Sequence, residues 1–169
     1  MAAVHPPLPP MVLLEYSDVY DRTPILSREL RAKVIIHEQR KTETCIASAA
    51  AYYRIHPLIL KGIFKQEGGD VGVISRNKNG TNDYGKGQIN SVWFNEFALQ
   101  GIRVSWQQLT FNNCFNIYTA AYIYTIHFRE TGNVSKAIAN YHSKTPVKGA
   151  AYLDKVFKHI KTMVQEDAS

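Results

Sequence analysis

The sequence predicts a mainly α-helical fold that contains one small, irregular hairpin and loop region. Apolar side chains recur three and four residues apart, as on one face of a helix, both before residue 68 and after residue 92. Between these stretches, residues 70–90 are rich in Gly and Asn and keep no helical period. Loops held by a rigid scaffold often carry the functional residues of a domain. We therefore expect the loop region to border the functional site.

Three helices are expected before the loop region. Thr23-Pro24 is typical of a helix start, with Thr23 as the N-cap, and the amphipathic pattern that follows continues to about residue 41. An alanine-rich helix is predicted for residues 44–53. His56-Pro57 opens the third helix, which is expected to stop at Gly68-Gly69.

The loop region itself predicts a short hairpin whose turn is Asn79-Gly80. A sequence pattern typical of helices returns near Val92 and in residues 105–109. Longer helices are then expected for residues 113–131, 134–141 and 150–165.

Residues 1–22 are expected to form an extended N-terminal arm, and residues 23–169 a single folded domain. The arm contains the run His5 to Pro10 (HPPLPP), which favours polyproline II. No stretch has the roughly 20 apolar residues of a membrane-spanning helix. The apolar run from Met11 to Leu14 is too short for a signal peptide. We expect that, if the protein is exported, its signal is absent from this chain.

The charge balance indicates an anionic partner. The formal net charge is +6, which suits a bacterial cell wall, an anionic membrane or a nucleic acid. Lys and Arg are scattered along the chain and no nucleic-acid-binding motif accompanies them, so we expect no nucleic-acid partner. The six His residues lie in different segments without the close spacing of metal ligands. We expect neither a metal nor a cofactor.

The two cysteines, Cys45 and Cys114, lie in predicted helices. They are either two reduced core thiols or one disulfide, and the sequence favours neither. A disulfide would require an oxidising compartment and would add about 4 kcal/mol to stability if loop entropy dominates.

Glu67 is the first candidate catalytic residue. It follows Leu60 and Phe64 at i+7 and i+3 on the third helix, so it shares their face and lies at the edge of the core. Burial raises the pKa of a carboxyl, and a carboxyl that is protonated near neutral pH can act as a general acid. A solvated glutamate at a helix end is the alternative, and spacing alone favours it. A helix C-terminus, however, also disfavours a negative charge.

Asp83 is the candidate second carboxylate. If residues 70–83 form a hairpin, Asp83 returns toward the end of the third helix, opposite Glu67. Most enzymes that cleave glycosidic bonds use two carboxyl groups on opposite sides of a cleft. Asp70 competes for this role, but its position beside Gly68-Gly69 is more typical of turn chemistry.

The run from Phe64 to Trp93 (FKQEGGDVGVISRNKNGTNDYGKGQINSVW) resembles the active-site region of lysozyme-like muramidases. It resembles most the small lytic transglycosylases of the soluble type that accompany type III and type IV secretion, conjugation and pilus machines. The matching motifs are Glu67-Gly68-Gly69, Ser75-Arg76-Asn77, Asp83, Gln88-Ile89-Asn90, Asn113-Cys114 and residues 137–143 (AIANYHS). The likeness extends from about Cys45 to Phe157 and implies a lysozyme-like α+β fold.

The resemblance implies that Glu67 protonates the glycosidic oxygen between N-acetylmuramic acid (MurNAc) and N-acetylglucosamine (GlcNAc). In lytic transglycosylases the same carboxylate then activates the MurNAc C6 hydroxyl, which closes a 1,6-anhydro ring. Tyr141 matches the tyrosine that lies over the site, with a core position as its alternative. Gln88 and Asn90 would bind the sugars or else cap turns. Ser75, Asn77 and Tyr152 are further substrate-binding candidates, and Tyr152 fits a core position equally well.

The chain departs from the family pattern at two glycines. Gly68 replaces the serine that follows the catalytic glutamate, and Gly87 replaces a hydrophobic residue before Gln88. A Gly-Lys-Gly-Gln loop is expected to leave a roomier sugar subsite. The catalytic acid itself is unaffected.

Three functions are compatible with these motifs. The favoured one is a lytic transglycosylase that opens the cell wall for a secretion, conjugation or pilus system. A muramidase that hydrolyses the same bond with Asp83 as second carboxylate is the first alternative. A peptidoglycan-binding scaffold module with weak activity is the second. All three imply peptidoglycan as partner and a periplasmic or exported location.

Overall fold

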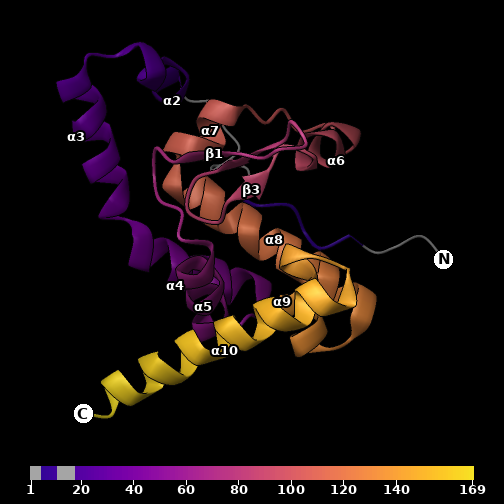
Figure 1. Ribbon diagram of the computed structural model, residues 1–169. Coiled ribbons are helices and arrows are strands. Elements are labelled where there is room, and N and C mark those ends of the chain that lie inside the picture. Colours follow the sequence, from indigo (N-terminus) through magenta and orange to yellow (C-terminus); the bar gives the residue numbers. More distant parts are fainter. Residues whose placement is uncertain (1–4, 11–17) are drawn as a thin grey trace.

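The computed structural model describes residues 5–10 and 18–169 and has a mainly α-helical fold with a small antiparallel sheet (Figure 1). This confirms the predicted fold class. The helices are α2 (Asp18–Arg22), α3 (Arg28–Gln39), α4 (Thr42–Tyr53), α5 (Pro57–Glu67), α6 (Trp93–Leu99), α7 (Trp106–Phe111), α8 (Asn113–Thr131), α9 (Val134–His142) and α10 (Pro146–Asp167), with a 3₁₀ turn, η1 (Thr23–Ile25), after α2. The strands are β1 (Ile74–Arg76), β2 (Asn82–Tyr84) and β3 (Ile89–Asn90).

Helix α8 lies at the centre of the fold (Figure 1). Its side chains are buried nearly all the way around, as expected for a helix that is apolar on every face, and Ile117 and Tyr122 are fully buried. Helices α4 and α9 pack against α8, and α10 packs against α9 and α5. The sheet and α6 lie on the other side of α8 from α10 (Figure 1). These contacts hold the end of α5 facing the sheet.

The predicted start of the first long helix is wrong. Thr23 begins the 3₁₀ turn η1, and its buried hydroxyl donates a hydrogen bond to the carbonyl of Val19 (2.7 Å), so it is not available to cap a helix. Helix α3 starts at Arg28 instead, and the Ser27 hydroxyl oxygen accepts a hydrogen bond from the amide of Leu30. The contact of Thr23 with Val19 thus moves the start of the helix from the predicted position to Ser27.

The boundaries of the later helices lie close to those predicted. His56 caps α5, because its Nδ1 accepts a hydrogen bond from the amide of Leu58, and α5 ends at Glu67 as expected. Helix α8 has the predicted bounds. Helix α10 starts earlier than expected, at Pro146, because proline fits the first turn of a helix.

The predicted hairpin is present in residues 74–84. Strand β1 pairs antiparallel with β2 so that Ser75 lies opposite Asp83, and β2 pairs with β3 so that Asp83 lies opposite Asn90. The Asn79-Gly80 pair lies in a loop closed by a hydrogen bond from the amide of Asn77 to the carbonyl of Thr81. Asp83 is thus on the middle strand of the sheet.

Part of the predicted arm packs on the domain. Three side chains of the domain donate hydrogen bonds to backbone carbonyls of the arm: Arg129 to residue 5, Tyr53 to residue 7 and Tyr52 to residue 8. Residues 18–22 of the arm form α2, whereas residues 1–4 and 11–17, including the apolar run 11–14, lie outside the described residues. Within residues 5–10 and 18–169, no helix is long and apolar enough to cross a membrane.

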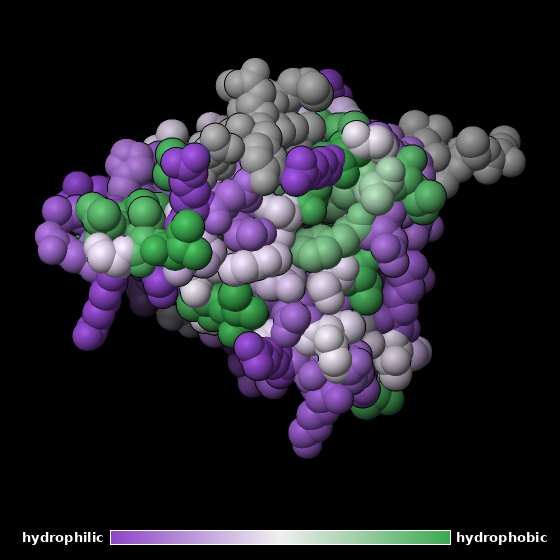
Figure 2. Space-filling model, turned by 90° about the horizontal axis from the view of Figure 1, so that it is seen from above, coloured by the Kyte–Doolittle hydropathy of each residue, from purple (hydrophilic) through white to green (hydrophobic). Residues whose placement is uncertain are grey.

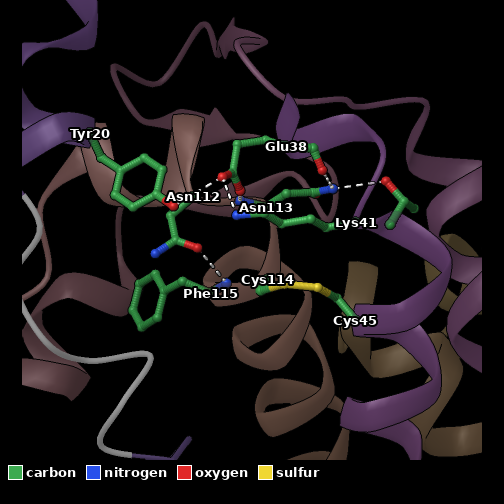
Figure 3. A network of polar contacts seen from close by, with 9 residues as sticks. Tyr20, Glu38, Lys41, Cys45, Asn112, Asn113, Cys114 and Phe115 are labelled. Carbon is green, nitrogen blue, oxygen red and sulfur yellow. Dashed lines mark hydrogen bonds and ion pairs between the residues drawn. A yellow bond between two sulfur atoms is a disulfide. The ribbon is translucent and has the colours of Figure 1, made fainter. Parts of the chain in front are cut away.

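Cys45 and Cys114 form a disulfide that joins α4 to α8, with their Cα atoms 5.2 Å apart (Figure 3). Beside it lies the buried carboxylate of Glu38, on α3. Its oxygens accept hydrogen bonds from the Tyr20 hydroxyl (3.0 Å), the Lys41 ammonium (2.6 Å) and the backbone amide of Asn113 (3.1 Å) (Figure 3). The disulfide and this network together fix the first turn of α8 against α3 and α4.

The surface does not present one continuous apolar face in the view of Figure 2. Hydrophobic residues form separate patches among hydrophilic ones there. Single exposed apolar side chains such as Ile25 and Leu99 are ordinary for a folded domain.

Candidate active site

Glu67 is the last residue of α5, and the local sequence places it at the edge of the core. Leu60 and Phe64 are buried on the same face of the helix. The helix ends because Gly68 adopts a left-handed conformation (φ 67°) and its amide bonds to the carbonyl of Phe64. A Cβ atom on Gly69 would overlap the carbonyl oxygen of Gly85. The double glycine therefore lets the loop after β2 approach the end of α5.

The pKa of Glu67 is raised from 4.5 to about 7. Burial of the carboxyl is the main cause, and the negative charge of Asp83 adds to it. The hydroxyl of Tyr152, on α10, donates a hydrogen bond to Oε1 of Glu67 (2.7 Å) and opposes the rise, because it stabilises the ionised carboxylate. Near pH 7 both protonation states of Glu67 are populated.

Asp83 is held by amide groups from both neighbouring segments. Asn77 donates a hydrogen bond to Oδ2 and Asn90 donates one to Oδ1, each at 2.8 Å. The same two amides contact the hydroxyl of Thr81 (3.1 and 3.0 Å). Because both carboxylate oxygens accept hydrogen bonds, the side chain of Asp83 has a fixed orientation.

Most of the predicted site residues line one cavity of about 250 Å³. Its walls come from the end of α5, the sheet and helices α6, α8 and α9. The lining residues are Glu67, Asn77, Asp83, Gln88, Ile89, Asn90, Trp93, Ile123, Tyr141 and His142. Asp70 is not among them; its oxygens accept hydrogen bonds from Gln39 and from the amide of Val71, in keeping with a turn role.

Tyr141 reaches this cavity from α9. Its hydroxyl donates a hydrogen bond to the carbonyl of Gly87 (2.8 Å). Burial raises the pKa of Tyr141 well above its usual value, and the carboxylates of Glu67 and Asp83 raise it further. Tyr141 therefore stays protonated at neutral pH and fixes the loop that carries Gln88.

A family model described as the transglycosylase SLT domain matches residues 44–150. The chain belongs to this family. The match runs from α4 into the first turns of α10 and includes every residue that lines the cavity. It confirms the resemblance to lytic transglycosylases of the soluble type.

Curated relatives of this SLT domain are named X polypeptide. One from Escherichia coli is 34% identical over 113 residues, which is 65% of this chain and 64% of the relative, and one from Escherichia coli strain K12 matches to the same extent. A third, also from Escherichia coli, is 35% identical over 102 residues, or 59% of this chain and 58% of the relative. The chain thus spans just under two thirds of the length of these relatives.

Two predicted substrate-binding residues of the SLT domain lie outside the first cavity. Ser75 is opposite Asp83 in the sheet register but is not among the lining residues. Tyr152 is buried, and its ring stacks on His142 with 4.8 Å between centroids and 5° between planes. His142 therefore covers one face of the ring. The Tyr152 hydroxyl contacts Glu67, in keeping with the core position that the sequence left open.

Gly87, which the sequence suggested would leave a roomier sugar subsite, lies against α8 and α9. A Cβ atom on Gly87 would lie 3.0 Å from the Tyr141 hydroxyl, 3.0 Å from Cβ of Ala120 and 3.2 Å from Oδ1 of Asn116. The missing side chain would thus point toward α8 and α9. Glycine at this position allows the Tyr141 hydroxyl to reach the backbone of the loop.

Asn116 supports the site and was not singled out from the sequence. It is buried on α8, its Oδ1 accepts a hydrogen bond from the amide of Gly87 (2.7 Å), and its Nδ2 donates to the carbonyls of Tyr84 and Leu109 (2.8 Å each). An asparagine in the first turn of an otherwise largely apolar helix was the only indication of this role in the sequence. Gln88 follows this anchored loop with φ 49° and donates a hydrogen bond to the Gly85 carbonyl.

The described part of the chain has no group of three or more His, Cys, Asp or Glu side chains that could hold a metal ion. The site brings together two carboxyls with different surroundings. One is half-buried with a pKa of about 7, and the other accepts amide hydrogen bonds on both oxygens. Such a pair suits acid–base cleavage of a glycosidic bond.

Proposed function

We propose that this SLT domain is a peptidoglycan lytic transglycosylase that cleaves the β-1,4 bond between MurNAc and GlcNAc without consuming water. The pKa of about 7 at Glu67 carries this proposal. A transglycosylase that uses one carboxyl as acid and then as base needs a group that gains and loses its proton within each cycle. A carboxyl whose pKa lies near the working pH meets that need.

In the first step, protonated Glu67 donates its proton to the glycosidic oxygen, and GlcNAc leaves with a free 4-hydroxyl. The MurNAc ring becomes an oxocarbenium-like cation. In the second step, ionised Glu67 accepts the proton of the MurNAc C6 hydroxyl while that oxygen bonds to C1. The product is 1,6-anhydroMurNAc and Glu67 is again protonated. The hydroxyl of Tyr152 stabilises the ionised form between the two steps.

The other cavity residues have supporting roles in this proposal. Tyr141 holds the loop that precedes Gln88, and Gln88 contributes a hydrogen-bonding side chain to the cavity wall. The amide donors of Asn77 and Asn90 are engaged with Asp83, which leaves their carbonyl oxygens for sugar hydroxyl or N-acetyl groups. For Asn90 that oxygen also accepts from the amide of Val92.

Hydrolysis of the same bond is a second candidate, and Asp83 is the observation that favours it. Asp83 lines the same cavity as Glu67, and its two amide hydrogen bonds fix the orientation of its side chain. An ionised carboxylate at this place can stabilise the sugar cation or attack it, after which water completes hydrolysis. Membership of the transglycosylase family favours the first candidate.

Digestion of purified peptidoglycan separates these functions. The soluble muropeptides are weighed by mass spectrometry, and a 1,6-anhydro end is lighter than a reducing end by one water. Anhydro products support the transglycosylase. Reducing ends in their place support the muramidase, and a lack of soluble products in the presence of binding supports a scaffold module.

The location and the wider role are also proposals. The Cys45–Cys114 disulfide favours an oxidising compartment, and peptidoglycan lies outside the cytoplasm, so we propose a periplasmic or exported protein. The motif resemblance supports the proposal that the protein opens the cell wall for a secretion, conjugation or pilus system. Cells that lack the chain should lose transfer, secretion or pili, and wild-type protein should restore them whereas the Glu67→Gln variant should not.

A further inference from the structure

A second cavity adjoins the first and has a different chemical character. Its volume is about 380 Å³, and it lies between α10 and the ends of α5 and α9. The lining residues are Gln66, Glu67, His142, Lys148, Ala151, Tyr152 and Lys155. Glu67 and His142 line both cavities, so the second is continuous with the site of the catalytic acid.

The cations of this cavity come from one face of α10. Lys148, Ala151, Tyr152 and Lys155 are spaced i, i+3, i+4 and i+7, so their side chains line up along the helix. Within residues 5–10 and 18–169, neither lysine takes part in a salt bridge, whereas Lys144, in the turn just before α10, pairs with Glu130. The two ammonium groups are exposed at the rim and available to an anion.

The two cavities thus divide the cleft by charge. The first contains amide side chains and two carboxyls but neither Lys nor Arg, which suits neutral sugar rings with hydroxyl and N-acetyl groups. The second adds two lysines next to Glu67. Peptidoglycan has the same division, because its sugars are neutral while the peptide on the lactyl group of MurNAc carries carboxylates. MurNAc is one of the two sugars at the scissile bond, so its peptide must lie close to Glu67.

We propose that the cavity with Lys148 and Lys155 is a subsite for a carboxylate of the peptide carried by MurNAc at the scissile bond. This inference rests on the proposed function, since it assumes that the sugars occupy the first cavity. The lysines attract the peptide carboxylate and thereby place the substrate with its MurNAc on the α10 side of Glu67. The subsite makes the enzyme prefer strands whose peptides are present and charged.

Binding to an inactive protein tests this subsite separately from cleavage. In the Glu67→Gln background, calorimetry compares a soluble GlcNAc–MurNAc oligomer whose peptides have free carboxylates with the same oligomer whose peptide carboxylates are amides. The test variant is Lys148→Gln with Lys155→Gln. The matched control is Lys158→Gln with Lys161→Gln, which removes the same charge from exposed positions of α10 outside both cavities.

The test variant should bind the oligomer with free carboxylates about five-fold more weakly than the parent, as expected for two exposed ion pairs. The control should bind it like the parent, and the oligomer with amides should not distinguish the three proteins. The difference should shrink in 0.5 M salt, because exposed charge pairs are screened.

Equal binding of the free-carboxylate oligomer by the test variant and the control would overturn the subsite while leaving the proposed function intact. An equal loss on both oligomers would also overturn it, because the lysines would then not act through charge. Absence of binding by the parent to either oligomer would instead overturn the proposed function. Circular dichroism of each variant shows whether it is folded before it is compared.

Discussion

The hydroxyl of Tyr152 lies 2.7 Å from Oε1 of Glu67 and donates a hydrogen bond to it, although the two residues are 85 positions apart in the sequence. This contact lowers the pKa of Glu67 against the effect of burial. It therefore sets how much of the catalytic acid is ionised near neutral pH.

Replacing Tyr152 by Phe should raise the pKa of Glu67 above 7, because the ionised carboxylate loses a donor. The alkaline limb of the pH profile of kcat/KM should move upward by about one pH unit. The measurement is the rate of muropeptide release between pH 4 and 9. Tyr124→Phe, at a buried tyrosine of α8 that lines neither cavity, is the control and should leave the profile in place. An unmoved limb in Tyr152→Phe would rule out this positioning role.

Glu67→Gln should lower the cleavage rate at least about 100-fold, because glutamine cannot donate a proton. It should also change the pH dependence of stability. The carboxyl titrates near 7 in the folded protein and near 4.5 when unfolded, so the folded state binds more protons between these values. Wild-type stability should thus fall as the pH rises from 4.5 to 7, by up to about 3 kcal/mol.

Urea unfolding at pH 4.5 and pH 8 measures that difference. The glutamine variant should lose less stability than wild type between the two pH values, and at pH 8 it should be the more stable protein. Cleavage near the wild-type rate by Glu67→Gln would remove Glu67 from the role of acid. A parallel pH response of the two proteins would mean that the Glu67 carboxyl titrates normally.

Asp83→Asn should lower the pKa of Glu67, because the negative charge of Asp83 helps to raise it. The alkaline limb of kcat/KM should accordingly move to lower pH. A transglycosylase should retain much of its activity at the new optimum, and its products should still end in 1,6-anhydroMurNAc. Asp70→Asn is the control, since Asp70 lies outside the cavity. Loss of cleavage at every pH in Asp83→Asn alone would favour the muramidase.

Gly87→Ala should destabilise the fold by about 1 to 3 kcal/mol, because the new Cβ would lie 3.0 Å from both the Tyr141 hydroxyl and Cβ of Ala120. Activity should fall as well, since the loop before Gln88 must shift. Adding Tyr141→Phe removes one of the crowded atoms and should recover part of the stability. A double-mutant cycle from urea unfolding measures this coupling, and strictly additive effects would contradict it.

Titration of the unfolded, unreduced protein should detect no free thiol at Cys45 or Cys114, and reduction should release two. Reduction should lower the free energy of unfolding by about 4 kcal/mol if loop entropy dominates. A Cys45→Ser, Cys114→Ser protein is the control and should not respond to the reductant. Two thiols before reduction would remove the disulfide and the support it gives to an exported location.

The parts of the site that the sequence predicted are those encoded locally. Helical spacing after Leu60 put Glu67 on the buried face, and the glycine-rich run predicted both the end of α5 and the hairpin with Asp83. Each of these features depends on residues within a few positions of one another, where the geometry of helices and turns is restrictive.

Contacts between distant segments could not be predicted in the same way. Nothing near Tyr152 in the sequence indicates that its hydroxyl reaches Glu67, because that depends on how α10 packs against α5. Likewise, Asn116 holds the Gly87 loop only because α8 passes beneath the sheet. The start of α3 at Ser27 was missed for a different reason, a local hydrogen bond from the Thr23 hydroxyl to the Val19 carbonyl that the capping pattern did not indicate.

The buried Glu38 has a practical consequence for where this domain can be cut. The family match begins at residue 44, yet the amide of Asn113 at the start of α8 bonds to the Glu38 carboxylate, and the Asn113 side chain bonds to the Glu38 backbone. A fragment trimmed to the matched segment would lose these partners and leave the first turn of the central helix unsatisfied. A fragment that keeps α3 should therefore be more stable than one trimmed to residues 44–150, because it retains the partners of the first turn of α8.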